Sequence, residues 1–236
     1  GEDGIRKRGP ARGLGEVKNG QLLRWGDPNS RRNVQFSGGE LKLFVRAERV
    51  AAAKPGEHAV KVQLRENAKD TAYTWPVMDA TYVLSDAAPE PRPASTHPLQ
   101  RPRSVHWSGR DIYPVRVSAG RRLRGIHFAE AWSEDGIDYE VDVPPLAGNV
   151  EFTRFPVWVV NPLLLESVAA GFTLWRSHER FGGAFSFPFR MRRLCFCGAK
   201  PEEGSRLRCY LRVSGVTPKS QIGDIYVTDG NGNEVM

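Results

Sequence analysis

The sequence predicts an α+β fold in which an antiparallel sheet wraps around one long helix. Short apolar runs separated by turn residues make up most of the chain, a pattern typical of a β-rich protein. One segment, beginning at Asn161 and Pro162, instead carries apolar residues at helical spacing. A helix isolated among strands can bury its apolar sides only if sheet surrounds it, so we expect it at the centre of the fold.

Composition sets the size and the class of the protein. The chain has 236 residues, of which 40% are hydrophobic and 26% charged, enough for one large or two small packed domains. No run approaches the roughly 18 apolar residues that a membrane span needs, and the charged N-terminus lacks the apolar core of a signal peptide. We therefore expect a soluble, cytoplasmic protein without membrane contact.

The net charge favours acidic partners. It is formally +7, with an isoelectric point near 9.5, which suits nucleic acid, phosphate-bearing cofactors or an acidic protein. Part of the excess lies in a Gly-rich basic leader, residues 1–18, which we expect to be disordered. The other basic residues are scattered rather than arranged in a stripe, so nucleic acid is not the expected partner.

The segment 19–86 predicts a β-rich first half. Apolar and polar residues alternate in its strands, which predicts one buried and one solvated face. Turn residues at Asp27–Ser30 separate the first two strands, and Pro76 predicts a bulge or an edge in the last one. The expected strands cover residues 22–25, 33–36, 41–46, 60–65 and 72–84. Proline-rich residues 87–103 then predict an extended, solvated linker.

The second half, residues 104–236, again predicts strands on both sides of the helix. In the run 206–213, three arginines and Tyr210 share one face, opposite Leu207, Cys209 and Leu211. We expect that basic face to be the solvated outside of a sheet, with a phosphate or carrier-protein site as the alternative. The final Asp229–Gly232 predicts a hairpin turn. The expected strands cover 105–107, 112–117, 120–128, 139–143, 187–197, 206–213 and 224–227.

The helix start is the strongest local signal. Asn161 is a good N-cap, and Pro162 suits the first helical position. An apolar stripe then continues at helical spacing, which predicts a helix from about 162 to 179. The stripe consists of Leu164, Val168, Phe172 and Trp175.

The three cysteines do not indicate a metal site or a disulfide. Cys195 and Cys197 are two apart, which is strand alternation rather than metal-ligand spacing, and Cys209 is left over. We expect all three to pack as small hydrophobic residues.

Five segments of the second half follow one another in the order of a known family. They are Gly120 to Ile126, Trp132, Asn161 to Glu166, Phe187 to Phe189 and Val227 to Gly230. They resemble the Gly-Pro-x-Phe type segment, the Trp-bearing strand, the His-Pro-x-Leu-Leu-Asp helix start, the Pro-Phe segment and the Asp-x-x-Gly strand end of polyketide synthase dehydratase domains and their polyunsaturated fatty-acid synthase relatives. The resemblance implies a double hotdog, in which each antiparallel sheet wraps a central helix.

The resemblance also implies an activity. The family removes water from a 3-hydroxyacyl chain carried on the phosphopantetheine arm of an acyl carrier protein and uses no other cofactor. A His of the first hotdog takes the α proton, and an Asp on the helix of the second protonates the leaving hydroxyl. By position Glu166 would be the acid, and Asn161 stands where the family has His. Such an acid works inside apolar surroundings.

The implied binding residues surround the tunnel mouth where the arm enters. The arginines between Gly120 and Gly125 would pair with its phosphate, although a surface turn rich in Arg needs no ligand. His106 and His127 could line the same cavity, but strand residues of this kind are more often half packed. The expected substrate- and phosphopantetheine-binding residues are Tyr113, Arg121, Arg122, Arg124, Trp158 and Pro162.

Several positions depart from the family pattern. Glu166 replaces Asp, and a shift of a carboxyl by about 1 Å can cost on the order of a hundredfold in rate. Ala170 stands where Gln or His is expected one turn later. The family's His-x-x-x-Gly-x-x-x-x-Pro motif does not occur in the first half, whose histidines are His58 and His97. His178 to Gly182 has the opening spacing, but at the wrong end of the helix, so we interpret it as coincidence. Residues 19–86 also lack a convincing central helix, so we expect an incomplete first hotdog. Either its opening strand, catalytic His and helix precede Gly1, or the protein is a diverged relative that never had them.

Three functions follow from these observations. The first is a dehydratase-like domain of a polyketide synthase, acting on 3-hydroxyacyl carrier-protein thioesters, with activity impaired by its substitutions. The second is a noncatalytic acyl-binding or scaffolding hotdog of a multienzyme. The third is a basic β-rich module that binds nucleic acid or glycan. The first two predict an acyl carrier protein and neighbouring synthase domains as partners.

Overall fold

The computed structural model describes residues 21–30, 43–52, 54–65, 76–87, 90, 92–94, 97–113, 115–147, 160–181, 186, 190–217 and 220–236. The leader, Trp158 and the Phe187–Phe189 segment lie outside these residues. The chain divides into two compact units, Gly1–Ala88 and Pro89–Met236.

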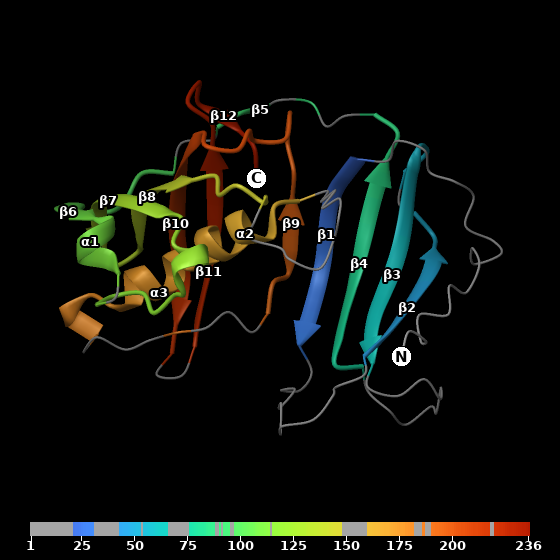
Figure 1. Cartoon of the computed structure of the whole chain (residues 1–236), viewed down its shortest axis with the longest axis horizontal. Coiled ribbons are helices and arrows are strands. Elements are labelled where there is room, and N and C mark those ends of the chain that lie inside the picture. Colours follow the sequence, from blue (N-terminus) through green and yellow to red (C-terminus); the bar gives the residue numbers. More distant parts are fainter. Residues whose placement is uncertain are drawn as a thin grey trace, which may run out of the picture. The chain divides into compact units, whose positions relative to one another are not determined.

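The first unit contains four antiparallel strands in the order β2-β3-β4-β1 (Figure 1). The structure describes no helix in this unit. The strands are β1 (Gln21–Ser30), β2 (Phe44–Val50), β3 (Glu57–Arg65) and β4 (Met78–Ser85).

Two predictions for this unit are wrong. The segment Asp27–Ser30 is not a turn but the end of β1, whose register against β4 shifts between Gly26 and Asn29. A bulge of this kind accommodates Pro28, which has no N–H for the ladder. The strand at 41–46 lacks the expected buried face, because Phe44 and Val45 are both exposed on β2, at the edge of the sheet.

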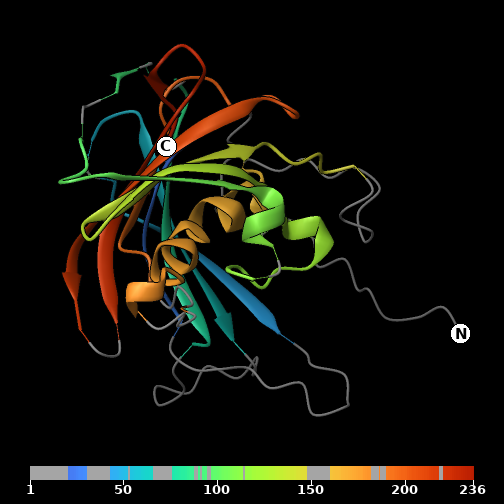
Figure 2. The ribbon, with the colours of Figure 1, turned by 90° about the vertical axis from the view of Figure 1, so that its left-hand side faces the viewer.

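The second unit has a seven-stranded antiparallel sheet in the order β5-β12-β11-β10-β8-β7-β6. Its strands are β5 (Arg92–Pro93), β6 (Arg103–Ser108), β7 (Ile126–Ser133), β8 (Gly136–Asp142), β10 (Arg206–Val216), β11 (Gln221–Thr228) and β12 (Asn233–Glu234), with the short β9 (Arg193–Cys195) outside this sheet. The helices are α1 (Gly109–Ile112), η1 (Arg121–Leu123), α2 (Pro162–Ala169), α3 (Gly171–Arg176) and η2 (Glu179–Phe181). Figure 2 shows α2 and α3 against the inside of the curved sheet, the hotdog arrangement that the sequence predicts.

Helices α2 and α3 form one nearly continuous helix. Ala170 between them keeps helical angles, its N–H donates to Glu166 O over 2.9 Å, and its carbonyl accepts from Leu174 N over 2.9 Å. The α-helix ends at Arg176, three residues before the predicted end at 179, because His178 N turns to Trp175 O in the tighter i to i+3 pattern.

The helix is fixed to the sheet by hydrogen bonds inside the core. Trp132 Nε1 of β7 donates to Trp175 O over 3.1 Å, and Trp175 Nε1 donates back to Ser133 O over 2.8 Å. Tyr139 of β8 donates its hydroxyl proton to Val168 O over 2.5 Å. These reciprocal bonds satisfy the polar tips of three large buried side chains and set the position of the helix.

The strand predicted at 112–117 is also wrong. This segment begins inside α1 and continues as turns, with Arg116 N donating to Ile112 O over 2.8 Å. Asp111 Oδ2 accepts from Ser108 N at 2.8 Å and Ser108 Oγ at 2.6 Å, which closes the first turn of α1. Local capping therefore outweighs the β propensity of Ile112 and Val115. The predicted strand 120–128 is likewise η1 followed by the start of β7.

Candidate functional site

Asn161 holds the start of α2 in place. Its Oδ1 accepts from Leu163 N at 3.0 Å and Leu164 N at 3.1 Å, while its Nδ2 donates to Pro144 O over 2.7 Å. The side chain is only 4% exposed. Both polar ends are thus engaged inside the protein, so Asn161 acts as a helix cap. Pro162 follows as the first helical residue, half-buried.

Glu166 lies one turn further along α2 and is exposed. The residues on the other sides of this turn, Leu164, Ser167 and Val168, are buried. The expectation of a carboxylate enclosed by apolar side chains is therefore wrong in the described part of the chain. Helix α2 packs on η1 and β8, so Glu166 shares its neighbourhood with the arginine-rich turn.

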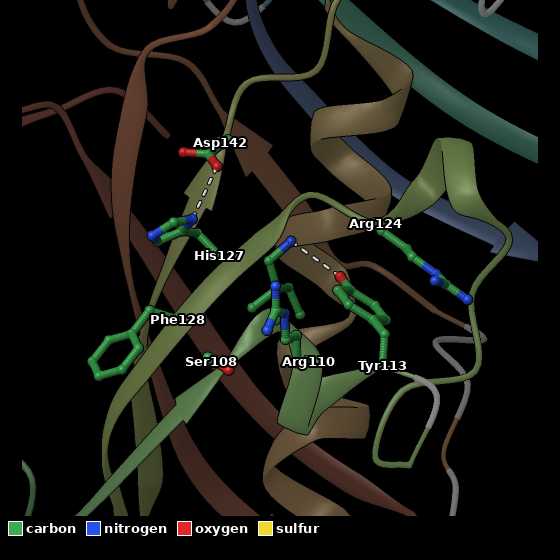
Figure 3. A pocket seen from close by; sticks show the side chains of 9 residues that line it. Ser108, Arg110, Tyr113, Arg124, His127, Phe128 and Asp142 are labelled. Carbon is green, nitrogen blue, oxygen red and sulfur yellow. Dashed lines mark hydrogen bonds and ion pairs between the residues drawn. The ribbon is translucent and has the colours of Figure 1, made fainter.

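Tyr113 is the buried member of this neighbourhood. It is 8% exposed and lies at the end of α1 rather than on a strand, and its hydroxyl oxygen accepts from Ile126 N over 3.0 Å (Figure 3). Burial raises the pKa of Tyr113 above its ordinary value, Arg124 lowers it and Glu166 raises it further. Tyr113 thus feels the charges of two other predicted site residues, which come from two other segments.

The η1 arginines are all exposed. Arg124 follows directly after η1; its Nε donates to Ala119 O over 3.1 Å and its guanidinium lies 5.5 Å from the centre of the Tyr113 ring. Arg121 and Arg122 precede it on η1. Gly125 allows η1 to approach α2, since a Cβ there would lie 2.2 Å from Ser167 Oγ.

A pocket of about 490 Å³ opens beside Tyr113 and Arg124 (Figure 3). It is formed by the end of β6, α1, the start of β7 and the end of β8. Sequence reasoning missed most of it, because Arg110 is brought there by the unexpected helix α1. The lining residues are Ser108, Gly109, Arg110, Tyr113, Arg124, Ile126, His127, Phe128 and Asp142.

His127 and Asp142 form an exposed pair at the pocket. His127 Nδ1 lies 3.2 Å from Asp142 Oδ2, and Asp142 Oδ1 accepts from Arg206 Nε over 2.9 Å. In Figure 3 this pair lies on the opposite side of β7 from Tyr113 and Arg124. His127 therefore does not face the neighbourhood of Glu166, and His106 is exposed and outside the pocket lining.

His178 is a packing residue. Its ring stacks on Trp132 with the ring centres 3.8 Å apart, at the end of the helix. This position agrees with our interpretation that its family-like spacing is coincidence.

The basic face of β10 has the predicted alternation, but its arginines are paired with carboxylates. Arg206 lies 2.9 Å from Asp142, and Arg212 lies 2.6 Å from Asp138. Arg208 pairs with Glu130. The partners come from the neighbouring strands β7 and β8, so this face is a network of ion pairs on a sheet rather than a free basic surface for nucleic acid or phosphate.

Sequence comparisons find no relative of this chain. No protein-family model matches it, and a search of curated proteins finds no match.

Solved structures do match. The dehydratase domain of RzxB from Pseudomonas fluorescens has a TM-score of 0.59 at 14% identity, over 93% of this chain and 74% of that chain. The dehydratase domain from the CurH module of the curacin polyketide synthase has a TM-score of 0.57 at 17% identity, over 90% and 73%. A trans-acyltransferase polyketide synthase enoyl-isomerase has a TM-score of 0.55 at 12% identity, over 91% and 77%. The chain therefore has the double-hotdog fold of polyketide synthase dehydratase domains.

Proposed function

We propose that the chain is a dehydratase-like domain of a polyketide synthase that binds a carrier-borne acyl chain and does not dehydrate it. The fold supports the class, since two structural neighbours are named as dehydratase domains and one of them as part of the curacin polyketide synthase. The observation that carries the proposal is the start of α2, where Asn161 is engaged as a cap and Glu166 is exposed. One structural neighbour is named as an enoyl-isomerase, which supports the idea that this fold can have a function other than dehydration.

Dehydration needs two groups that act on the same substrate. A base removes the proton from the carbon next to the thioester, and an acid protonates the hydroxyl on the next carbon, so that one water leaves. Carboxylic acids that donate protons near neutral pH work from apolar enclosures, and Glu166 lies in none formed by the described residues.

The second part of the reaction is the base, and the family's His motif is not found within these 236 residues. Of the five histidines, only His178 has a glycine four residues later, as the family motif requires. His178 stacks on Trp132 and serves the packing of the helix end. Within the 236 residues, neither half of the acid and base pair is therefore found in the form that the family uses.

Binding is what the site still supports. Tyr113 presents a buried ring beside the exposed guanidinium of Arg124, and the pocket next to them has a volume suited to part of a small ligand. An acyl carrier protein would bring the acyl chain on its phosphopantetheine arm, and no other cofactor is needed. Arg121, Arg122 and Pro162 are the further residues proposed for contact with the arm.

The test combines binding with turnover. The intact chain is incubated with a carrier protein bearing a 3-hydroxyacyl thioester, its affinity is measured by fluorescence anisotropy, and loss of water is followed by mass spectrometry. We expect saturable binding that exceeds the binding of the carrier without an acyl chain, and no loss of water. Turnover above the uncatalysed rate would overturn the proposal, and so would equal affinity for the two carriers.

The second candidate is an active dehydratase in which Glu166 is the acid. It is supported by the electrostatic effect of Glu166 on Tyr113, which is one of the residues proposed for binding. In this case the intact chain releases water, and Glu166→Gln lowers the rate by at least about a hundredfold, as expected for loss of a general acid. A rate that Glu166→Gln leaves unchanged would exclude this role.

A further inference from the structure

We infer that the pocket between α1, β7 and β8 binds a phosphate group and that Arg110 is its principal ligand. Arg110 is exposed, lines the pocket, and forms no hydrogen bond or ion pair with any residue that the structure describes. A guanidinium directed into a concave site without a counter-charge is suited to an oxyanion, whose geometry its planar fork matches.

The short helix α1 fixes the direction of Arg110. Ile112 is fully buried and anchors the helix to the core. The adjacent carboxylate, Asp111, accepts from Ser108 N and Ser108 Oγ. Asp111 is thus turned toward the start of the helix, and it leaves the charge of Arg110 available to a ligand.

A second cation lies on the other side of the pocket. Arg124 uses its Nε to bind Ala119 O, and its guanidinium is held near the Tyr113 ring at 5.5 Å. This fixes the side chain while its terminal nitrogens form no hydrogen bond with the described residues. Two arginines from separate elements therefore line the same pocket.

The remaining lining suits an anion attached to a larger body. Asp142, which also lines the pocket, is held by His127 and Arg206, so its charge is compensated. Ile126 and Phe128 add apolar surface. The volume of about 490 Å³ lies within the roughly 300–1,000 Å³ of small-molecule sites and exceeds what a phosphate alone would fill.

Two sources can provide this phosphate: the phosphodiester of the carrier arm, or a free phosphate ester. The first source rests on the proposed function, whereas phosphate binding itself does not. The direct test is calorimetric titration of the chain with phosphopantetheine and with pantetheine, which differ only in the phosphate. We expect phosphopantetheine to bind at least about tenfold more tightly, the contribution of a charge-assisted hydrogen bond or more.

The variants assign the effect to Arg110. Arg110→Gln should remove the difference between the two compounds, and Arg110→Lys should keep part of it. Arg103→Gln is the matched control, because Arg103 is an exposed arginine of the adjacent β6 that does not line the pocket. Equal binding of the two compounds by the unaltered chain, or an undiminished preference in Arg110→Gln, would overturn the inference.

Binding of the carrier protein then identifies the source of the phosphate and tests the proposed function separately. If Arg110→Gln weakens binding of the carrier with its arm but not of the carrier without it, the phosphate is that of the arm. If carrier binding is unchanged while the preference for phosphopantetheine over pantetheine is lost, the site serves a free phosphate ester. Failure of acyl-carrier binding with intact phosphate binding would overturn the proposed function and support the inference.

Discussion

Asn161 shows how a side chain that the sequence predicts for the site can serve the fold. Its amide satisfies two N–H groups at the start of α2 and one carbonyl, Pro144 O. Asn161→Ala should therefore lower the free energy of unfolding by about 1–2 kcal/mol, as loss of an N-cap does. Asn161→Asp keeps the acceptor but loses the donor to Pro144, so its loss should be smaller. Urea denaturation measures both.

The Asn161→Ala variant also distinguishes a helix-capping role from a substrate-binding role. If Asn161→Ala unfolds like the unaltered chain but no longer binds the acylated carrier, the residue contacts the substrate and our interpretation is wrong. Equal affinity with lowered stability is the expected result.

Tyr113 combines burial with a single hydrogen bond that fixes the start of β7. Its hydroxyl accepts from Ile126 N over 3.0 Å, and Tyr113→Phe would leave that buried N–H without its acceptor. We expect the free energy of unfolding to fall by about 1–3 kcal/mol, the penalty for an unsatisfied buried donor. Thermal and urea denaturation report the change. An unaltered stability would mean that Ile126 N finds another partner in the variant.

At the scale of elements, helix α2 approaches the start of β7 only because Gly125 has no side chain. A Cβ at this position would lie 2.2 Å from Ser167 Oγ and 2.8 Å from Ser167 Cβ. Gly125→Ala should lower stability by about 1–3 kcal/mol through overpacking. Gly120→Ala is the matched control, since a Cβ there meets nothing within 4 Å.

The double variant tests the cause. Ser167→Gly removes the clashing atoms at a cost of about 1 kcal/mol for glycine in a helix. The combination of Gly125→Ala and Ser167→Gly should therefore be less destabilised than the sum of the two single changes. Additive losses would show that the helix and the strand do not meet at this point.

Elements governed by local chemistry were predictable from the sequence. The start of α2 depends on Asn161 and Pro162 alone, and the alternation of β10 depends on neighbouring residues, so both predictions are confirmed. The exposure of Glu166 was also within reach, because Glu166 follows the buried Leu164 by two residues and thus lies roughly 200° around the helix from the apolar stripe. The family resemblance led us to expect burial there instead.

Other features depend on contacts that the sequence does not display. The segment from Ile112 was predicted as a strand. The hydrogen bonds between Ser108 and Asp111 instead start helix α1, which ends at Ile112. Since α1 was not expected, neither was the pocket that contains Arg110. The exposure of Phe44 and Val45 follows from the position of β2 at the edge of the sheet. That position depends on the order of the strands, about which the sequence of a single strand carries no information.

At the scale of the whole molecule, the core of the second unit contains groups that must stay protonated in the folded state. Cys209 of β10 and Tyr139 of β8 are fully buried or nearly so, and burial raises the pKa of each well above its ordinary value. In the unfolded chain a cysteine ionises near pH 8.5. Below that pH the thiol is protonated in both states, so the stability that depends on it is fully present.

As the pH rises above about 8.5, the unfolded chain releases the Cys209 proton while the folded chain retains it, so stability must fall. One such proton lowers the free energy of unfolding by up to about 1.4 kcal/mol per pH unit. We expect urea midpoints to decrease steadily between about pH 8 and pH 10. Cys209→Ala should be less stable at neutral pH because of its cavity, yet show a shallower decrease. Equal slopes in Cys209→Ala and the unaltered chain would mean that the core opens to solvent before this thiol ionises.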